Sequence, residues 1–186
     1  MRRWRRDAPP LADLSDPMVA IATVESDNSA RIDPVQHDGN GWVRCDLGHR
    51  HWGRFGAAGL LLIDRAGPGE PVVLLQHRAV WTANGDTWGV PGGARDSHET
   101  PAEGALREAR EETGIQAGSV RIGDELLDDH GSWSYTTVLA ELIAPVVLRP
   151  QEESAELRWV PVGGVTELDL HPGFARTWPR LRERLG

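Results

Sequence analysis

Residues 93–115, which read GARDSHETPAEGALREAREETGI, decide how the middle of this chain folds. Thr100 and Glu103 have the spacing of a capping box, and Pro101 occupies the first helical position. Gly114 stands where a left-handed residue would end the helix. Small and apolar residues recur between these ends at helical spacing. The sequence therefore predicts a helix over residues 101–113 with a narrow apolar stripe.

The same helix carries three carboxylates, Glu108, Glu111 and Glu112, at relative positions i, i+3 and i+4. On a helix these side chains lie on one face, where each like-charge pair costs about 0.2–0.5 kcal/mol. Acids in the last turn also meet the negative end of the helix dipole. Because the helix gains nothing from this arrangement, we expect a divalent cation, Mg²⁺ or Mn²⁺, to compensate it. Four-residue spacing lets Arg107 pair with both Glu103 and Glu111.

A charge-rich surface helix is the alternative, but it leaves residues 88–93, WGVPGG, unexplained. This glycine-rich stretch lets the backbone come close to a ligand or metal. The combined region fits the pattern G-x5-E-x7-R-E-U-x-E-E-x-G-U, where U is aliphatic. The fixed positions are filled by Gly93, Glu99, Arg107, Glu108, Ala109, Glu111, Glu112, Gly114 and Ile115.

With these residues the chain resembles the Nudix hydrolases, and a looser resemblance covers residues 56–162. The resemblance implies an α/β (α+β) fold, an α/β/α sandwich with a mixed β-sheet. It also implies a metal-dependent hydrolase that cleaves the pyrophosphate bond of a nucleoside diphosphate linked to another group.

Cleavage of a pyrophosphate requires neutralisation of charge on the bridging oxygens, which acid-held metal ions supply. We expect Glu112 and Glu108 to be the principal ligands of Mg²⁺ or Mn²⁺. Glu111 would be a third ligand or the base that orients the attacking water. The resemblance adds the carbonyl of Gly92 as a backbone ligand.

The resemblance also assigns supporting roles. Arg107 would position the catalytic acids, and Glu99 would lie beside the metal or bind it. A further carboxylate often precedes the last strand in this family, where this chain has Glu152, Glu153 and Glu156. We favour Glu153 as that ligand or base, against a solvated acidic loop.

For the substrate, a guanidinium suits bidentate phosphate contacts, and Arg78 follows a strand on the approach to the glycine stretch. Aromatic side chains near the site would border the base. The residues expected to contact substrate are Arg78, Trp81, Gly93, His130, Trp133 and Tyr135.

Substrate subclasses of the family tend to carry markers outside the signature. The proline typical of ADP-ribose enzymes is replaced here by Asp129-His130-Gly131, and the tyrosine of dinucleoside polyphosphate enzymes is matched only by Tyr135, a few residues late. The NADH and coenzyme A markers are absent. Elimination favours a nucleoside triphosphate, including an oxidised one, cleaved to monophosphate and pyrophosphate.

Three alternatives remain. A dinucleoside polyphosphate or ADP-sugar hydrolase would use the same metal chemistry. A non-catalytic nucleotide-binding regulatory module would be expected to lose acids from the signature, whereas this chain keeps them all. An isoprenoid diphosphate isomerase would need an upstream catalytic cysteine context, which we do not find.

Composition narrows the class of protein. The net charge of −8 argues against binding to a nucleic-acid polymer. A single cysteine fits a reducing compartment, and no apolar run reaches the roughly 20 residues of a membrane helix. The N-terminal residues lack the apolar segment of a signal peptide. We expect a cytoplasmic enzyme whose partner is a small-molecule nucleotide, and we retain a homodimer as one assembly open to it.

Cys45, His49 and His51 lie close together in CDLGHRH, which hints at zinc. A structural zinc ion usually needs four ligands, commonly in paired motifs, and the sequence offers no second pair. We therefore do not expect zinc at this position.

We expect the chain to divide into a disordered tail at 1–17, an extension of unclear role at 18–55 and a domain at 56–186 that resembles the Nudix hydrolases. We expect a strand or short helix at 19–24, and strands at 41–45, 57–64, 72–78, 120–127, 134–143 and 156–162. A last helix spans 174–185, where Pro179 forces a start or a kink near Trp178.

Overall fold

The computed structural model describes residues 37–185. The predicted tail at 1–17 and the element at 19–24 lie outside these residues. The larger elements are the strands β3 (Ala57–Asp64), β4 (Val72–Arg78), β7 (Val120–Asp129), β8 (Ser134–Leu142) and β9 (Ser154–Pro161), and the helices α1 (Pro101–Thr113) and α2 (Pro172–Glu183). Short strands are β1 (Trp42–Arg44), β2 (Arg50–Trp52), β5 (Trp88–Gly89) and β6 (Gly92–Ala94), and 3₁₀ turns span Ala117–Ser119 and Val162–Glu167.

The main sheet is mixed and has β3 at its centre. β3 pairs in parallel with β8 and antiparallel with β4 and β6. β7 lies antiparallel to β8, and both β5 and β9 lie antiparallel to β4. β1 and β2 form a separate two-stranded antiparallel hairpin. The β3–β6 pairing places the glycine stretch beside the centre of the sheet.

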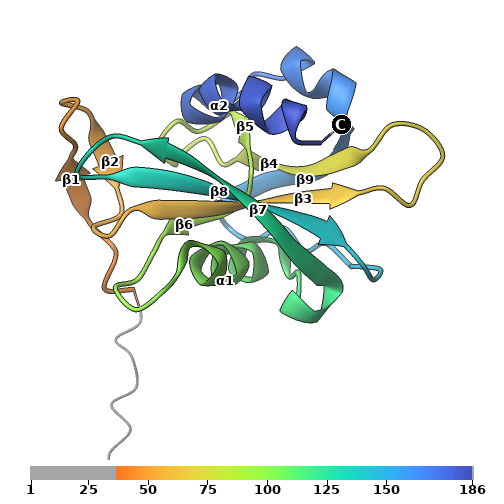
Figure 1. Ribbon diagram of the computed structural model, residues 1–186, viewed down its shortest axis with the longest axis horizontal. Coiled ribbons are helices and arrows are strands. Elements are labelled where there is room, and N and C mark those ends of the chain that lie inside the picture. The colour runs from red at the N-terminus through yellow and green to blue at the C-terminus, as the bar shows by residue number, and fades with distance from the viewer. Residues whose placement is uncertain (1–36, 186) are drawn as a thin grey trace, which may run out of the picture. The chain divides into compact units, whose positions relative to one another are not determined.

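Both faces of β3 are buried, which explains its unbroken apolar sequence. Leu61 and Ile63 belong to one core cluster with Trp178 of α2. Leu60 and Leu62 belong to a second cluster with the small residues of α1. The two helices lie on opposite faces of the sheet (Figure 1). The predicted α/β/α sandwich with a mixed sheet is confirmed.

Helix α1 begins and ends as predicted. The amide of Glu103 donates to the Thr100 hydroxyl at 3.3 Å, and the Glu103 carboxylate accepts from the Thr100 amide at 2.8 Å. Gly114 ends the helix with φ of 79°. Ala105 and Ala109 are fully buried. These small side chains let α1 approach the sheet closely, and this approach brings the acids of the helix to β6.

Helix α2 differs from the prediction, because it begins at Pro172 and continues through Pro179. A start near Trp178 is therefore wrong. The His171 side chain accepts from the Gly173 amide at 3.1 Å and caps the helix before Pro172. Pro179 is exposed, so its ring points away from the core. None of the helices in this described part of the chain is long and apolar enough to span a membrane.

Two strands also extend further than predicted. β7 continues to Asp129 because Asp128 and Asp129 pair with Tyr135 and Ser134 of β8. The turn between these strands therefore contracts to residues 130–133. β9 begins at Ser154, which pairs with Arg78.

Candidate active site

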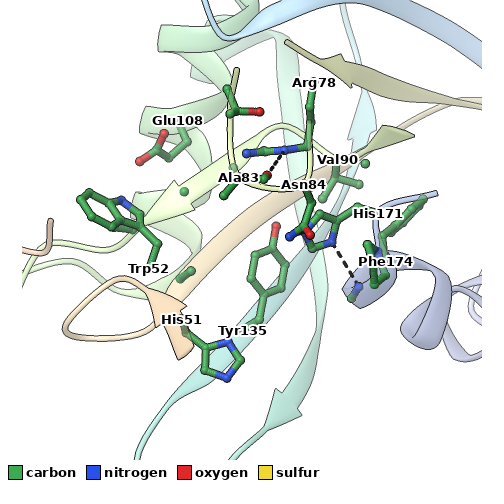
Figure 2. A pocket seen from close by; sticks show the side chains of 18 of the residues that line it. His51, Trp52, Arg78, Ala83, Asn84, Val90, Glu108, Tyr135, His171 and Phe174 are labelled. Carbon is green, nitrogen blue, oxygen red and sulfur yellow. Dashed lines mark hydrogen bonds between the residues drawn. The ribbon is translucent and has the colours of Figure 1, made fainter. Parts of the chain in front are cut away.

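A cleft of about 1030 Å³ lies where α1, β6, β8, the β4–β5 loop, the start of α2 and the β1–β2 hairpin meet. Figure 2 looks into it. The predicted site residues that line it are Arg78, Trp81, Gly92, Gly93, Glu108, Glu111, Glu112, His130, Trp133, Tyr135 and Glu153. Arg107 and Glu99 are absent from the lining, although Arg107 contacts Glu108 and Glu111. The fold thus brings predicted site residues from Arg78 to Glu153 together around one cleft.

Glu112 is the most buried of the acids, with 7% of its surface exposed. Its carboxylate accepts from the Gly92 amide at 2.8 Å. Burial, followed by the charge of Glu108, raises the pKa of Glu112 to about 8, although the Gln76 side chain and the Gly92 amide oppose this shift. Without a cation, Glu112 is therefore mostly protonated at neutral pH.

Glu108 lies against the backbone of Gly93. A β-carbon at Gly93 would approach the Glu108 carboxylate to 2.7 Å, which is closer than van der Waals contact allows. Burial raises the pKa of Glu108, while the Arg107 guanidinium opposes this shift. The glycine therefore leaves the space that the carboxylate occupies.

Arg107 contacts three acids, Glu99, Glu108 and Glu111. It forms two bonds to Glu99, at 2.7 and 2.9 Å, and it reaches Glu108 at 2.8 Å and Glu111 at 3.3 Å. It also donates to the Ala94 carbonyl of β6 at 2.8 Å. One guanidinium thus fixes α1 to the glycine stretch and sets the separation of its acids.

The predicted pairing of Arg107 with Glu111 is confirmed, but Glu99 takes the place of Glu103. Glu103 is engaged by the amide and hydroxyl of Thr100 in the capping box. Glu99 is held toward Arg107 by the Asp96 amide, which donates to it at 2.8 Å. Helical spacing could not reveal Glu99 as a partner of Arg107, because Glu99 precedes α1.

The three candidate acids before β9 lie in different surroundings. Glu153 lines the cleft, and its charge helps to raise the pKa of Glu108. Glu156 forms an ion pair with Arg158 at 2.8 Å and is absent from the lining. Glu152 is also absent from the lining. This placement favours Glu153, and its role as ligand or base stays a prediction, as does that of the Gly92 carbonyl.

Arg78 and the imidazole of His171 also line the cleft. Arg78 is half-buried and donates to the Ala83 carbonyl at 3.3 Å, and Tyr135 rises beneath it (Figure 2). Asn84 of the β4–β5 loop lies 3.0 Å from His171, which joins this loop to α2. Burial, Arg78 and Arg176 lower the pKa of His171 to about 4, so this imidazole is neutral at pH 7.

The aromatic residues predicted to border the base differ in accessibility. Trp81 is 65% exposed on the β4–β5 loop. Trp133 is 8% exposed, stacks on His51 and donates from its indole nitrogen to the Gly53 carbonyl. His130 is 5% exposed. Trp81 is therefore better placed for a ligand contact than Trp133 or His130.

Sequence reasoning missed part of the cleft wall. Trp42 and Trp52 line it from the β1–β2 hairpin, and their rings meet edge to face at 5.5 Å. Phe174 and Arg176 line it from α2. The two tryptophans flank CDLGHRH and are paired in register, so a hairpin prediction could have found them. No local signal pointed to the residues of α2.

With this geometry in hand, comparison with known proteins decides the family. A family model described as the NUDIX domain matches residues 53–181. This chain belongs to the Nudix hydrolase family. It is 50% identical over 159 residues to a Mycobacterium tuberculosis (strain H37Rv) protein named "Putative 8-oxo-dGTP diphosphatase 3", covering 82% of this chain and 73% of the relative. A Bifidobacterium longum nucleoside triphosphate pyrophosphatase/Nudix hydrolase fusion protein is 42% identical, covering 83% of this chain and 33% of the fusion.

Solved structures agree on the fold. A Nudix hydrolase from M. smegmatis, RenU, is 48% identical with a TM-score of 0.73, covering 78% of this chain and 94% of that one. A C. elegans Ap4A hydrolase is 20% identical with a TM-score of 0.58, covering 70% of this chain and 97% of that one. At that identity the second likeness shows the fold alone. The chain is thus a Nudix hydrolase, an enzyme of a family that acts on small nucleotide substrates and generally uses divalent metals.

Proposed function

We propose that this Nudix hydrolase cleaves nucleoside triphosphates, oxidised purine triphosphates among them, to the monophosphate and pyrophosphate with Mg²⁺ or Mn²⁺. The observation that carries the chemistry is the buried Glu112 beside Glu108 in a cleft that Arg78 also lines. The name of the M. tuberculosis relative supports the substrate class.

The acids fit a hard divalent cation. Glu112 and Glu108 present carboxylate oxygens in a partly buried site. Burial raises the pKa values of both, with the charge of Glu108 adding to the shift of Glu112 and the charges of Glu111 and Glu153 adding to that of Glu108. Such a cluster is stabilised by a cation that prefers oxygen ligands. Glu112 and Glu108 would hold it, with Glu111, Glu153 and the Gly92 carbonyl as further ligand candidates. When bound, the cation neutralises charge that develops on the bridging phosphate oxygens.

The protein side chains have separable tasks in this account. Glu111 is the most exposed acid of the trio and is held by Arg107, so it orients the attacking water or accepts its proton. Arg107 positions Glu108 and Glu111 without touching the substrate. Arg78, which lines the same cleft, holds the phosphates through its guanidinium.

The base of the nucleotide would lie between the aromatic residues of the cleft. Trp81 offers an exposed ring from the β4–β5 loop, and Trp133 also lines the cleft. Burial, with the nearby Glu112 charge, raises the pKa of Tyr135. Its hydroxyl therefore stays protonated and is available as a hydrogen-bond donor to substrate.

Initial rates on a substrate panel test this proposal. The panel comprises the common nucleoside triphosphates, 8-oxo-dGTP, ADP-ribose, a dinucleoside polyphosphate, NADH and coenzyme A, each with Mg²⁺. We expect a triphosphate to have the highest kcat/KM and to yield monophosphate and pyrophosphate in equal amounts. A preference of more than tenfold, about 1.4 kcal/mol, for ADP-ribose or the dinucleoside polyphosphate would overturn the substrate class. Metal binding without turnover of any compound would favour a regulatory module.

A further inference from the structure

A second group of metal-binding side chains lies beyond the acid cluster. Cys45, His49, His51 and His130 each place one ligand atom within 4.8 Å of the other three. We propose that these four residues form a structural zinc site that ties the β1–β2 hairpin to the turn between β7 and β8. It shares no ligand with the acid cluster, although His49, His51 and His130 line the same cleft, and it does not depend on the substrate proposed above.

The distances around Cys45 suit tetrahedral zinc. Its sulfur lies 3.3 Å from Nε2 of His51 and 3.8 Å from Nδ1 of His130. Zinc bonds of about 2.3 Å to sulfur and about 2.0–2.1 Å to nitrogen, at tetrahedral angles, place those atoms about 3.6 Å apart. The two observed distances bracket this value. The cluster needs only small side-chain movements to close on an ion.

The backbone of the hairpin is shaped to present two of the ligands. The Gly48 amide donates to the Cys45 carbonyl at 2.9 Å, and the Cys45 amide donates to the His49 carbonyl at 3.0 Å. Gly48 has φ of 84°, a conformation that a side chain would strain. This tight turn brings His49 back beside Cys45, and the strand alternation of β2 places His51 near them.

The fourth ligand comes from a distant part of the chain. His130 lies 85 positions after Cys45 and follows β7 directly. The Asp46 amide donates to the His130 carbonyl at 3.2 Å, and the Asp46 carboxylate accepts from the Ser132 amide at 3.1 Å. These bonds dock the hairpin on the turn. The sequence analysis considered only the candidate ligands within residues 45–51 and so missed His130, the fourth ligand.

Residues around the cluster orient the imidazoles. Asp128 lies 3.4 Å from Nε2 of His130 and is itself held by Arg176 at 2.8 Å. Zinc-bound histidines commonly direct their other nitrogen toward such a carboxylate, which leaves Nδ1 free to face the metal. The ring of His51 stacks on Trp133 with centroids 3.8 Å apart. Two of the three histidines therefore have defined orientations.

The ligand set favours zinc in a closed, structural site. One thiolate and three imidazoles match the sulfur and nitrogen donors that zinc takes. Four protein ligands leave no position for substrate, unlike a catalytic zinc site. The hairpin that the ion would fix also carries Trp42 and Trp52 of the cleft wall. Zinc would thus hold one wall of the active site in place.

Metal analysis of the full-length, untagged protein, grown with zinc, tests the proposal. We expect about one zinc per chain after dialysis, as a four-ligand site requires. Cys45→Ser and His130→Ala should each lose it. His98→Ala is the matched control, because His98 is outside this group and belongs to a different cluster with Asp38 and Asp96. The control should keep its zinc.

Two measurements on the unmodified protein guard against variants that fail to fold. Cobalt in place of zinc should give the visible spectrum of a tetrahedral ion with a thiolate charge-transfer band. Cys45 is the only cysteine, so its reaction with a thiol reagent is unambiguous. We expect it to react at least tenfold faster after zinc is removed.

Several outcomes would overturn the proposal. These are purified parent protein without zinc, a cobalt complex without a thiolate band, and a Cys45 that reacts equally fast with and without zinc. Zinc that is lost in Glu112→Gln or His98→Ala but retained in Cys45→Ser would place the ion elsewhere. Each of these results leaves the nucleotide chemistry of the acid cluster untouched.

Discussion

At the scale of single residues, Gly93 and Glu108 show how tightly backbone and acid are fitted. A β-carbon at Gly93 would meet the end of the Glu108 side chain and not a rigid backbone atom. Gly93→Ala should therefore leave the fold intact, displace the carboxylate and lower kcat/KM by about tenfold to a hundredfold. Gly118→Ala is the matched control, since nothing lies within 4 Å of its new β-carbon. Equal activity in both variants would contradict the view that the close packing of Glu108 against Gly93 matters for activity.

The raised pKa of Glu112 makes the metal-free protein less stable at higher pH. The folded protein holds a proton up to about pH 8, while the unfolded chain releases it near its model value of 4.5. Between these values the folded state binds more protons, so the free energy of unfolding falls as pH rises. We expect a loss of about 2 kcal/mol between pH 5.5 and 7.5, measured by urea unfolding in chelator.

Glu112→Gln should abolish most of this slope, because the amide mimics the protonated acid. At pH 7.5 the metal-free variant should be at least as stable as the parent. A parent stability that rises over the same interval would show that Glu112 is ionised in the folded protein.

At the scale of elements, α1 carries the candidate catalytic acids, and Arg107 contacts Glu108 and Glu111 among them. Arg107→Gln removes contacts to Glu99, Glu108 and Glu111 together. We expect kcat to fall by about 10–100-fold, as for residues that orient metal ligands, with a smaller change in KM. Arg110→Gln is the matched control, because Arg110 is exposed on the same helix. A similar loss in both variants would indicate a general effect of helix charge.

The elements that the sequence predicts best are those set by local rules. The ends of α1 follow from Thr100, Glu103 and Gly114, and the bounds of β3 follow from an apolar run closed by turn residues. The start of α2 was missed because His171 caps it through a side chain, a contact that propensity does not reveal. Partners far apart in sequence, such as Cys45 with His130, depend on docking of the hairpin and could not be read locally.

At the scale of the whole molecule, the cleft gathers several acids together with Arg78, and its acids must lose protons before they bind a cation. With limiting Mg²⁺, we expect kcat/KM to rise from neutral to mildly alkaline pH, since the pKa of Glu112 is about 8 without metal. Saturating Mg²⁺ should shift this rise to lower pH. A maximum near pH 5 would contradict the assignment.

The cleft itself illustrates what sequence can predict of a site. The acids of α1 and Arg78, the predicted phosphate contact, were identified from the signature and its surroundings, and they line one cavity. The walls contributed by Trp52 and Phe174 were not, because those residues reach the cleft only through the packing of the hairpin and α2 (Figure 2). The sequence therefore predicted the residues proposed to carry the chemistry better than the residues that shape the cleft.

The central claim is that the acids of α1 carry metal-dependent cleavage of the pyrophosphate bond. The most direct test measures initial rates of pyrophosphate release for Glu112→Gln and Glu108→Gln beside Glu152→Gln. Glu152 is exposed and lies outside the cleft lining, so it controls for loss of charge. We predict losses of about 100-fold or more in the first two variants, with folding intact, and near-parental rates in the third. Near-parental turnover in both Glu112→Gln and Glu108→Gln would contradict the account.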